Sequence, residues 1–363
     1  MLEGIVTGIS RARSGAQIFV IVYDETVDAT LRSRKLENVY IQRIGRVQDL
    51  FDKIVVAQRV RSAVRRFRCD VLLTLNFFVP RVLVPQIVYH VDLERFEHHS
   101  IVPPILFNIT EKIRDRRAKL ALINAAANVF ESRFLRQAAV TYHNKIVVCN
   151  PSVIYIGIDE NSIVEAGVVN DQLDDGLIVS VTNPLEYKNN GALVPVLAEL
   201  QKREPNVNWR VRIFGGEGES VWGELIALAV RAGVRDRFEF MGYQNRAVLN
   251  ASLDSAICEF NTSKLESFCM VALEAMARGC PVVVSSEAAM PESVGSAGFV
   301  IDPDDFKAVA DKIVHLRNAP DVRMEIKRKS VVWARRRTWS QSGEAFVSLC
   351  DQTRASKKSV YRN

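Results

Sequence analysis

Two glutamates, Glu266 and Glu274, stand with seven residues between them in the segment LESFCMVALEAMARGCPVVVSS (Leu265–Ser286). A polar run, FNTSK, precedes this segment, and Ser267 is a suitable helix N-cap. The pattern therefore predicts a helix from Phe268 to about Arg278. Glu266 would lie at the mouth of this helix, and Glu274 two turns inside it among apolar residues.

The position of the two carboxylates indicates a ligand site. The N-terminus of a helix offers free N–H groups and a partial positive charge, which together favour a phosphate. A carboxylate among apolar neighbours is costly unless it is paired, and two ribose hydroxyls would pair Glu274. The alternative is a solvated Glu274 that pairs with Arg278, four residues further along the same helix.

Short apolar runs alternate with longer helical patterns along the whole chain, which favours parallel sheets covered by helices. Two such series predict two doubly wound domains. The predicted strands are residues 17–23, 70–75, 86–90, 128–132 and 145–149, then 177–182, 209–214, 238–242, 256–260, 281–286 and 298–302.

The predicted domains are residues 1–160 and 161–340, followed by a C-terminal helix and tail over residues 341–363. A polar, irregular junction at 156–175 separates the two halves. A doubly wound domain usually opens with a strand and a Gly-rich turn. Here the sequence begins with a helical pattern and reaches its first strand only at Gln17, so the first strand is expected to be missing.

The segment Ser263–Asp305 carries the glutamate pair, then EAMARGCPVVVSS, then PESVGSAGFVIDPDD. In this order of motifs it resembles the retaining, nucleotide-sugar-dependent glycosyltransferases of family 4, also called group 1. The resemblance extends through most of residues 175–349 and is fainter before them. It implies the GT-B fold, in which an N-terminal acceptor-side domain and a C-terminal nucleotide-sugar-binding domain, both Rossmann-like, face a cleft.

The resemblance also implies roles for single residues. Glu274 matches the glutamate that holds the donor ribose, and Glu266 matches the one beside the donor sugar. Lys188 matches the lysine that neutralises the diphosphate. Gly215 and Gly216 match a turn that lets the backbone approach the donor.

Further donor contacts are expected from Tyr243, in the loop beside the nucleobase, and from the start of the predicted helix at Phe268, Cys269 and Met270. His90 ends a predicted strand where members of the family often place a polar residue that faces the transferred sugar. A structural role for a histidine at a strand end is the alternative.

The sequence departs from the family at three positions. Asn183 stands where the family usually has an arginine, so one of the two positively charged side chains that bind the diphosphate is missing. Ser267 and Cys269 stand where glycines are usual. No base accompanies Cys269 in the local sequence, which argues against a nucleophilic thiol.

The activity expected from the resemblance is transfer of a sugar from a UDP-sugar or a GDP-sugar to a glycan or a lipid-linked acceptor, with retained configuration. Cell-surface polysaccharide synthesis, such as that of lipopolysaccharide, is the expected setting. No cofactor or metal is expected. The alternatives are a truncated or degenerate relative that binds nucleotide sugar without turnover, and a sugar-nucleotide epimerase or a phosphorylase on the same fold.

The charge distribution bears on location and partners. Residues 1–150 carry a net charge of +9, and the rest of the chain −3. Residues 50–68 and 111–122 are predicted to be basic helices, and each Lys or Arg near an anionic membrane contributes about 1 kcal/mol. The six cysteines form no C-x-x-C pair, which favours a cytoplasmic protein. Loose attachment to the inner leaflet is one hypothesis, and simple coverage of the sheet by these helices is the other. Nucleic-acid binding is not expected.

Overall fold

The computed structural model describes residues 1–13, 15–22, 25–43, 50–76, 80–91, 93, 109–142, 147–165 and 172–360. The chain forms two compact units. Unit 1 contains Met1–Gly157 and Arg337–Asn363, and unit 2 contains Ile158–Arg336. The final segment, predicted as a separate helix and tail, therefore belongs to unit 1.

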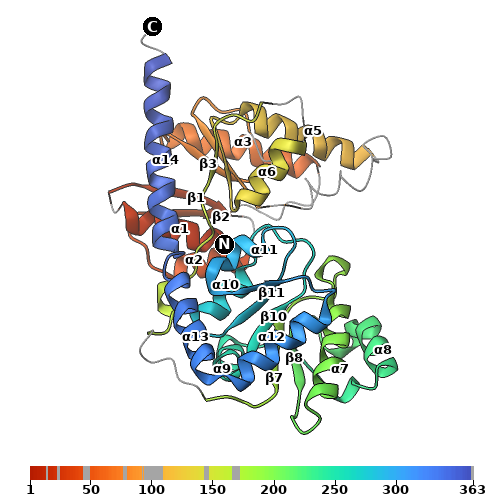
Figure 1. Ribbon diagram of the computed structural model, residues 1–363. Coiled ribbons are helices and arrows are strands. Elements are labelled where there is room, and N and C mark those ends of the chain that lie inside the picture. The colour runs from red at the N-terminus through yellow and green to blue at the C-terminus, as the bar shows by residue number, and fades with distance from the viewer. Residues whose placement is uncertain are drawn as a thin grey trace. The chain divides into compact units, whose positions relative to one another are not determined.

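Unit 1 contains two parallel sheets (Figure 1). One pairs β1 with β2, and the other has the order β3-β4-β5-β6. All side chains of β4 and β5 are buried, as a sheet covered on both faces requires. The strands are β1 Ile18–Val22, β2 Val39–Arg43, β3 Leu72–Leu75, β4 Gln86–His90, β5 Ala127–Phe130 and β6 Pro151–Val153.

The C-terminal helix is held in unit 1 by very close packing against the first helix, beside which it runs in Figure 1. A Cβ atom at Gly8 would lie 2.0 Å from the Trp339 carbonyl oxygen, and one at Gly343 would lie 2.1 Å from the Gly8 carbonyl carbon. Only glycine permits this approach of two helix backbones. The helices in the described part of this unit are α1 Leu2–Ala12, α2 Glu25–Ser33, α3 Leu50–Arg66, α5 Ile109–Asn124, α6 Arg133–Tyr142 and α14 Trp339–Val360.

Unit 2 is built on one six-stranded parallel sheet with the order β12-β11-β10-β7-β8-β9. The chain winds outward from β7 in one direction and then returns to continue from β10 in the other. The border between β7 and β10 is thus a topological switch point, where open α/β sheets bind ligands at the carboxyl ends of their strands. The strands are β7 Leu177–Val181, β8 Arg210–Phe214, β9 Phe238–Gly242, β10 Cys258–Asn261, β11 Val282–Ser285 and β12 Phe299–Ile301.

Helices cover both faces of this sheet (Figure 1). An apolar core joins one sheet face to α7, α8 and α12, with Trp209, Trp222 and Phe260 among its buried members. Helices α9, α10 and α13 lie outside this core. The helices are α7 Leu193–Arg203, α8 Gly223–Arg231, α9 Arg246–Ser255, α10 Met270–Ala277, α11 Met290–Val294, α12 Phe306–Asn318 and α13 Pro320–Ala334.

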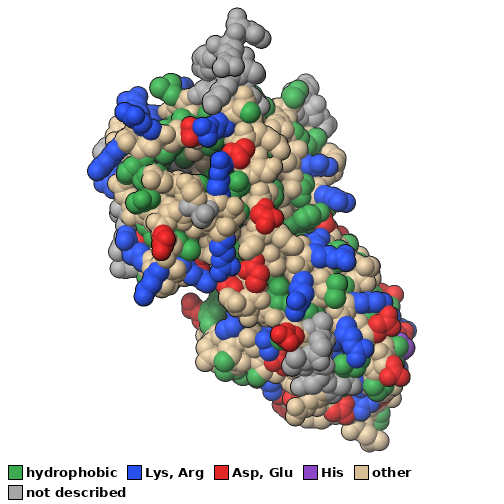
Figure 2. All heavy atoms as spheres, turned by 90° about the vertical axis from the view of Figure 1, so that its left-hand side faces the viewer, with side chains coloured by type: hydrophobic (Ala, Val, Ile, Leu, Met, Phe, Trp, Pro, Cys, Tyr) green, Lys and Arg blue, Asp and Glu red, His purple; other side chains and the backbone are tan. Residues whose placement is uncertain are grey.

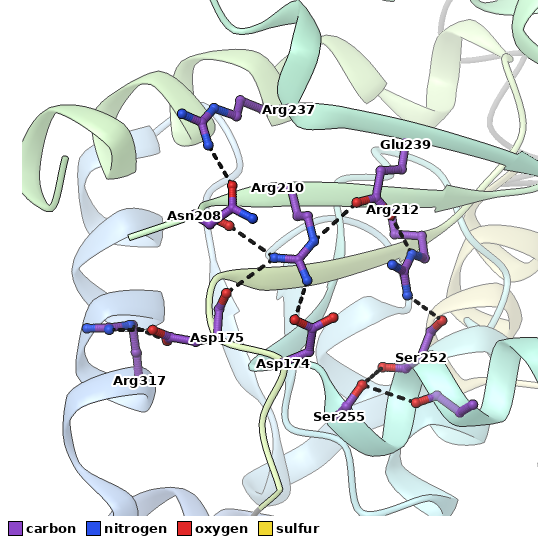
Figure 3. Close-up of polar contacts among 11 residues, drawn as sticks. Asp174, Asp175, Asn208, Arg210, Arg212, Arg237, Glu239, Ser252, Ser255 and Arg317 are labelled. Atoms are coloured by element: carbon purple, nitrogen blue, oxygen red, sulfur yellow. Dashed lines mark hydrogen bonds and ion pairs between the residues drawn. The ribbon is translucent and has the colours of Figure 1, made fainter. Parts of the chain in front are cut away.

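A polar network fastens the amino ends of three neighbouring strands in unit 2 (Figure 3). Arg210 pairs with Asp174 before β7 and with Glu239 on β9, and Glu239 also binds Arg212 at 2.6 Å. Arg317 of α12 holds Asp175 with two hydrogen bonds. Because this network occupies the amino edge, it serves the sheet's stability and leaves the carboxyl edge for a ligand.

Three predictions of local structure need correction. Strand β2 was not predicted, because Val39–Arg43 has too few apolar residues to stand out. The predicted strand 145–149 is wrong where it is described: the Cys149 N–H bonds to the Leu122 carbonyl at 3.0 Å, and pairing with β5 begins at Pro151. Residues 143–146 lie outside the described part of the chain.

The third prediction that needs correction is the start of the helix after Glu266. Helix α10 begins at Met270 and not at Phe268, and its N-cap is Cys269, in the left-handed region at φ 50°. Ser267 therefore does not cap it. The other end agrees with the prediction more closely, because Arg278 is the C-cap and Gly279 follows with φ 73°.

Candidate functional site

The carboxyl edge of the unit 2 sheet gathers most of the predicted site residues. Asn183 and Lys188 follow β7, Gly215 and Gly216 follow β8, and Tyr243 follows β9. Glu266 follows β10 and lies just before α10, which carries Glu274. Strands β7 and β10 are hydrogen-bonded neighbours, so the first and last of these loops meet at the switch point.

Lys188 and Glu266 are in direct contact. The Lys188 Nζ atom donates to a Glu266 Oε atom at 2.5 Å, and each side chain is 17% exposed. Burial by itself lowers the pKa of Lys188, but the charge and hydrogen bond of Glu266 outweigh burial, so that pKa is raised. The lysine is therefore a fixed positive charge at neutral pH, as a diphosphate site requires.

Two backbone contacts hold the loops that carry this pair. The Thr262 hydroxyl donates to the Lys188 carbonyl at 2.8 Å, and the Lys264 N–H donates to the Tyr187 carbonyl at 2.8 Å. Lys188 itself ends a short 3-10 turn, Glu186–Lys188, that closes the loop after β7. The lysine and glutamate are thus positioned by hydrogen bonds to the backbone of their loops and not only by their own attraction.

Glu274 has a partner that the sequence did not indicate. Arg246, the first residue of α9, holds both Glu274 oxygens, at 2.8 and 2.9 Å. Arg278, the partner suggested by helical spacing, instead binds Asp254 at 2.8 and 2.5 Å. The Glu274 side chain is 24% exposed, so it is neither fully solvated nor fully enclosed.

Asn183 organises the loops around it. Its Oδ1 atom accepts from the Gly216 N–H and from the Tyr243 hydroxyl, both at 3.3 Å. The Gly215 N–H donates to the Gly242 carbonyl at 3.0 Å, and a Cβ atom at Gly215 would lie 2.0 Å from the Thr182 carbonyl oxygen. Asn183 therefore joins the glycine turn to the loop carrying Tyr243.

Residues 268–270 differ in what they can offer a ligand. Phe268 and Cys269 are buried, while Met270 is partly exposed. Burial raises the pKa of the Cys269 thiol well above its usual value, and the negative charge of Glu266 raises it further. A neutral, enclosed thiol is a poor nucleophile, in agreement with the sequence analysis.

His90, the predicted site residue of unit 1, is fully buried at the end of β4. Its Nε2 atom lies 2.9 Å from Asn128 Oδ1, and its ring stacks on Phe130 with centroids 4.9 Å apart. Burial lowers the His90 pKa to about 4, against the opposing effect of the Asn128 hydrogen bond. The imidazole is therefore neutral at physiological pH, and contact with the transferred sugar stays a prediction.

Glu259 is a second residue that the sequence analysis passed over. It lies on β10 and has no exposed surface, and among the described residues its carboxyl oxygens have no hydrogen-bond partner of good geometry. Burial raises its pKa to about 8, and the nearby Glu266 contributes. A single acid within the apolar run AICEF was the available signal.

The fold places the protein among the two-domain GT-B proteins. A glycosyltransferase from Rickettsia africae ESF-5 superposes with a TM-score of 0.72 over 97% of this chain and 94% of that one, at 12% identity. Anabaena Alr3699/HepE, solved in complex with UDP, superposes with a TM-score of 0.68 over 96% of both chains at 17% identity. Residues 176–318 match the family model of group 1 glycosyl transferases, so unit 2 contains a domain of that family.

A curated relative is similar over a shorter length. The D-inositol 3-phosphate glycosyltransferase of Corynebacterium efficiens is 33% identical over 167 residues, which are 45% of this chain and 39% of the relative. The chain thus spans less than half the length of this relative, and the similarity does not extend to the whole protein.

Proposed function

We propose that the protein is a retaining glycosyltransferase that moves a sugar from a nucleoside-diphosphate sugar to a glycan or lipid-linked acceptor in cell-surface polysaccharide synthesis. The observation that carries the proposal is the contact between Lys188 and Glu266 at the switch point, beside the start of the helix that bears Glu274. A cation, a sugar-facing carboxylate and a ribose-facing carboxylate are the groups that a donor of this kind needs.

The reaction breaks the bond between the anomeric carbon and the diphosphate and forms one to an acceptor hydroxyl, whose proton leaves with the diphosphate. Lys188 would leave Glu266 for the diphosphate and stabilise the charge that develops on it. Glu266 would then orient the sugar hydroxyls and stabilise the positive charge at the reacting carbon. The free N–H groups at the start of α10 would supply further donors to the phosphates.

A UDP-sugar is the donor to test first, because Alr3699/HepE was solved with UDP. The acceptor is less constrained. The name of the Corynebacterium relative specifies D-inositol 3-phosphate, but only 39% of that protein is matched. A phosphorylated polyol is therefore one acceptor to include in the assay, beside lipid-linked glycans.

The deciding experiment is calorimetric titration of UDP, GDP and their common sugar conjugates into wild type and Glu274→Ala, followed by a search for acceptor-dependent release of the nucleotide. Selective binding that is lost in the variant, together with acceptor-dependent release, supports the transferase. Binding without release under any acceptor would favour a degenerate relative. A new sugar nucleotide formed without acceptor would favour an epimerase.

Attachment to an anionic membrane surface is proposed for unit 1. Helix α3 lines a shallow, open hollow with Gln58, Arg61, Ser62, Arg65 and Arg66. Figure 2 shows Lys and Arg side chains spread over the visible face of this unit, with fewer acidic ones between them. None of the described helices is both long and apolar enough to cross a membrane. Salt-sensitive sedimentation with anionic vesicles is the test, and no binding at low salt would refute the attachment.

A further inference from the structure

The ion pair between Arg246 and Glu274 occupies the group that the proposed function assigns to the donor ribose. The guanidinium makes two parallel hydrogen bonds, one to each carboxylate oxygen. This fork geometry is the strongest that arginine offers a carboxylate. Among the described residues, Arg246 is the only hydrogen-bond or ion-pair partner of Glu274. Both acceptor atoms that a ribose diol would use are therefore already engaged.

The two partners are unequally held. The Arg246 side chain is 59% exposed, whereas that of Glu274 is 24% exposed and lies within α10. Arg246 begins α9, and the cap of that helix comes from its neighbour Asn245, whose side chain accepts from the Val248 N–H at 3.1 Å. Moving the guanidinium therefore breaks no contact that shapes α9, so arginine is the partner that can leave.

We propose that Arg246 is a built-in occupant of the ribose position, which the two ribose hydroxyls displace from Glu274 when the donor binds. This inference rests on the proposed function of Glu274. It makes Arg246 a residue that sets donor affinity by competition and keeps Glu274 in place when no donor is bound. An exposed ion pair of this kind favours the paired state of Arg246 and Glu274 over the separated state by up to about fivefold. The hydrogen bonds that two ribose hydroxyls donate to the carboxylate can overcome this preference.

The competition gives an unusual salt dependence for a neutral ligand. A nucleoside carries no phosphate, so salt acts on its binding mainly through the ion pair that it must break. Screening weakens an exposed pair as ionic strength rises. Uridine should therefore bind wild type more tightly at 300 mM than at 20 mM NaCl, while UDP, which also needs Lys188, should bind more weakly.

The test is titration of uridine, guanosine and their diphosphates into the full chain and three variants, at both salt concentrations. Arg246→Ala should bind the nucleoside about threefold to fivefold more tightly than wild type at low salt, with the difference lost at high salt. Arg246→Lys, which keeps the charge without the fork, should fall between them. Arg278→Ala is the matched control, because it removes another two-bond arginine pair at the end of the same helix and should leave binding unchanged.

A second readout follows the arginine itself. The side-chain Nε–H resonance of Arg246 should move when UDP or uridine is added and stay fixed when pyrophosphate is added, because pyrophosphate lacks the ribose. If wild type binds nucleotide but Arg246→Ala binds the nucleoside no more tightly, the displacement is refuted and the proposed function stands. If neither wild type nor any variant binds a nucleoside or nucleotide, both are refuted.

Discussion

Lys188 and Glu266, which are 78 positions apart in the sequence, form a 2.5 Å ion pair at the border between β7 and β10. Each is the charge partner of the other. A diphosphate that binds Lys188 would replace Glu266 as the partner of the lysine, and the Glu266 carboxylate would then be free to face the sugar.

Replacing Lys188 should therefore slow turnover strongly. We expect Lys188→Ala to lose about 100-fold to 1,000-fold in the rate of nucleotide release from the donor, the range observed when one preorganised stabiliser of a developing negative charge is removed. Lys264→Ala is the matched control, because this nearby lysine pairs with Asp304 at 3.1 Å on the exposed surface. Equal rates for the two variants would contradict the assigned role of Lys188.

Asn183 should control nucleotide affinity through loop geometry. Asn183→Ala deletes the acceptor shared by Gly216 and Tyr243, and at about 1 kcal/mol for each hydrogen bond we expect UDP to bind roughly 5-fold to 30-fold more weakly. Tyr243→Phe removes only one of these bonds and should show the smaller effect. The measurement is calorimetric titration, and an Asn183→Ala affinity equal to that of wild type would exclude the role.

Glu259 should make the stability of the protein fall with rising pH. Its pKa is raised from 4.5 to about 8 in the folded protein, so between these two values the folded state binds the extra proton. The free energy of unfolding then decreases as pH rises from about 4.5 to 8 and is flat above, by about 1.4 kcal/mol for each unit of raised pKa.

Urea unfolding of wild type and Glu259→Gln across pH 5 to 9 measures this contribution. The variant keeps the shape of the side chain and cannot ionise, so its stability should exceed that of wild type at pH 9 and match it more nearly at pH 5. Parallel pH profiles for the two proteins would show that Glu259 does not titrate in this range.

The crossing of α1 and α14 should tolerate no side chain. Gly343→Ala places a Cβ atom 2.1 Å from the Gly8 backbone, and we expect a loss of about 1–3 kcal/mol in the free energy of unfolding, the usual cost of overpacking. Gly223→Ala is the control, since a Cβ atom there meets no other atom within 4 Å. Thermal unfolding compares them, and equal melting temperatures would contradict the close packing.

Most of the strands were predictable because apolar runs between turn residues identify them locally. The predictions for 86–90 and 238–242 match β4 and β9 at both ends. The failures occurred where local pattern and tertiary contact disagree. Residues 147–149 are apolar enough for a strand, yet the Cys149 N–H bonds to the end of α5. Cys269 caps α10 from a left-handed conformation that no sequence pattern predicts.

The sequence by itself determined the α/β class, the two-part organisation and the glutamate pair on one short segment, because these depend on neighbours along the chain. It could not determine the charge partners. Lys188 meets Glu266 only because β7 and β10 are adjacent at the switch point, and Arg246 meets Glu274 only because α9 and α10 approach each other through the fold. Ion pairs of this kind depend on which elements become neighbours in space, and the register of parallel strands decides that only when the whole sheet has formed.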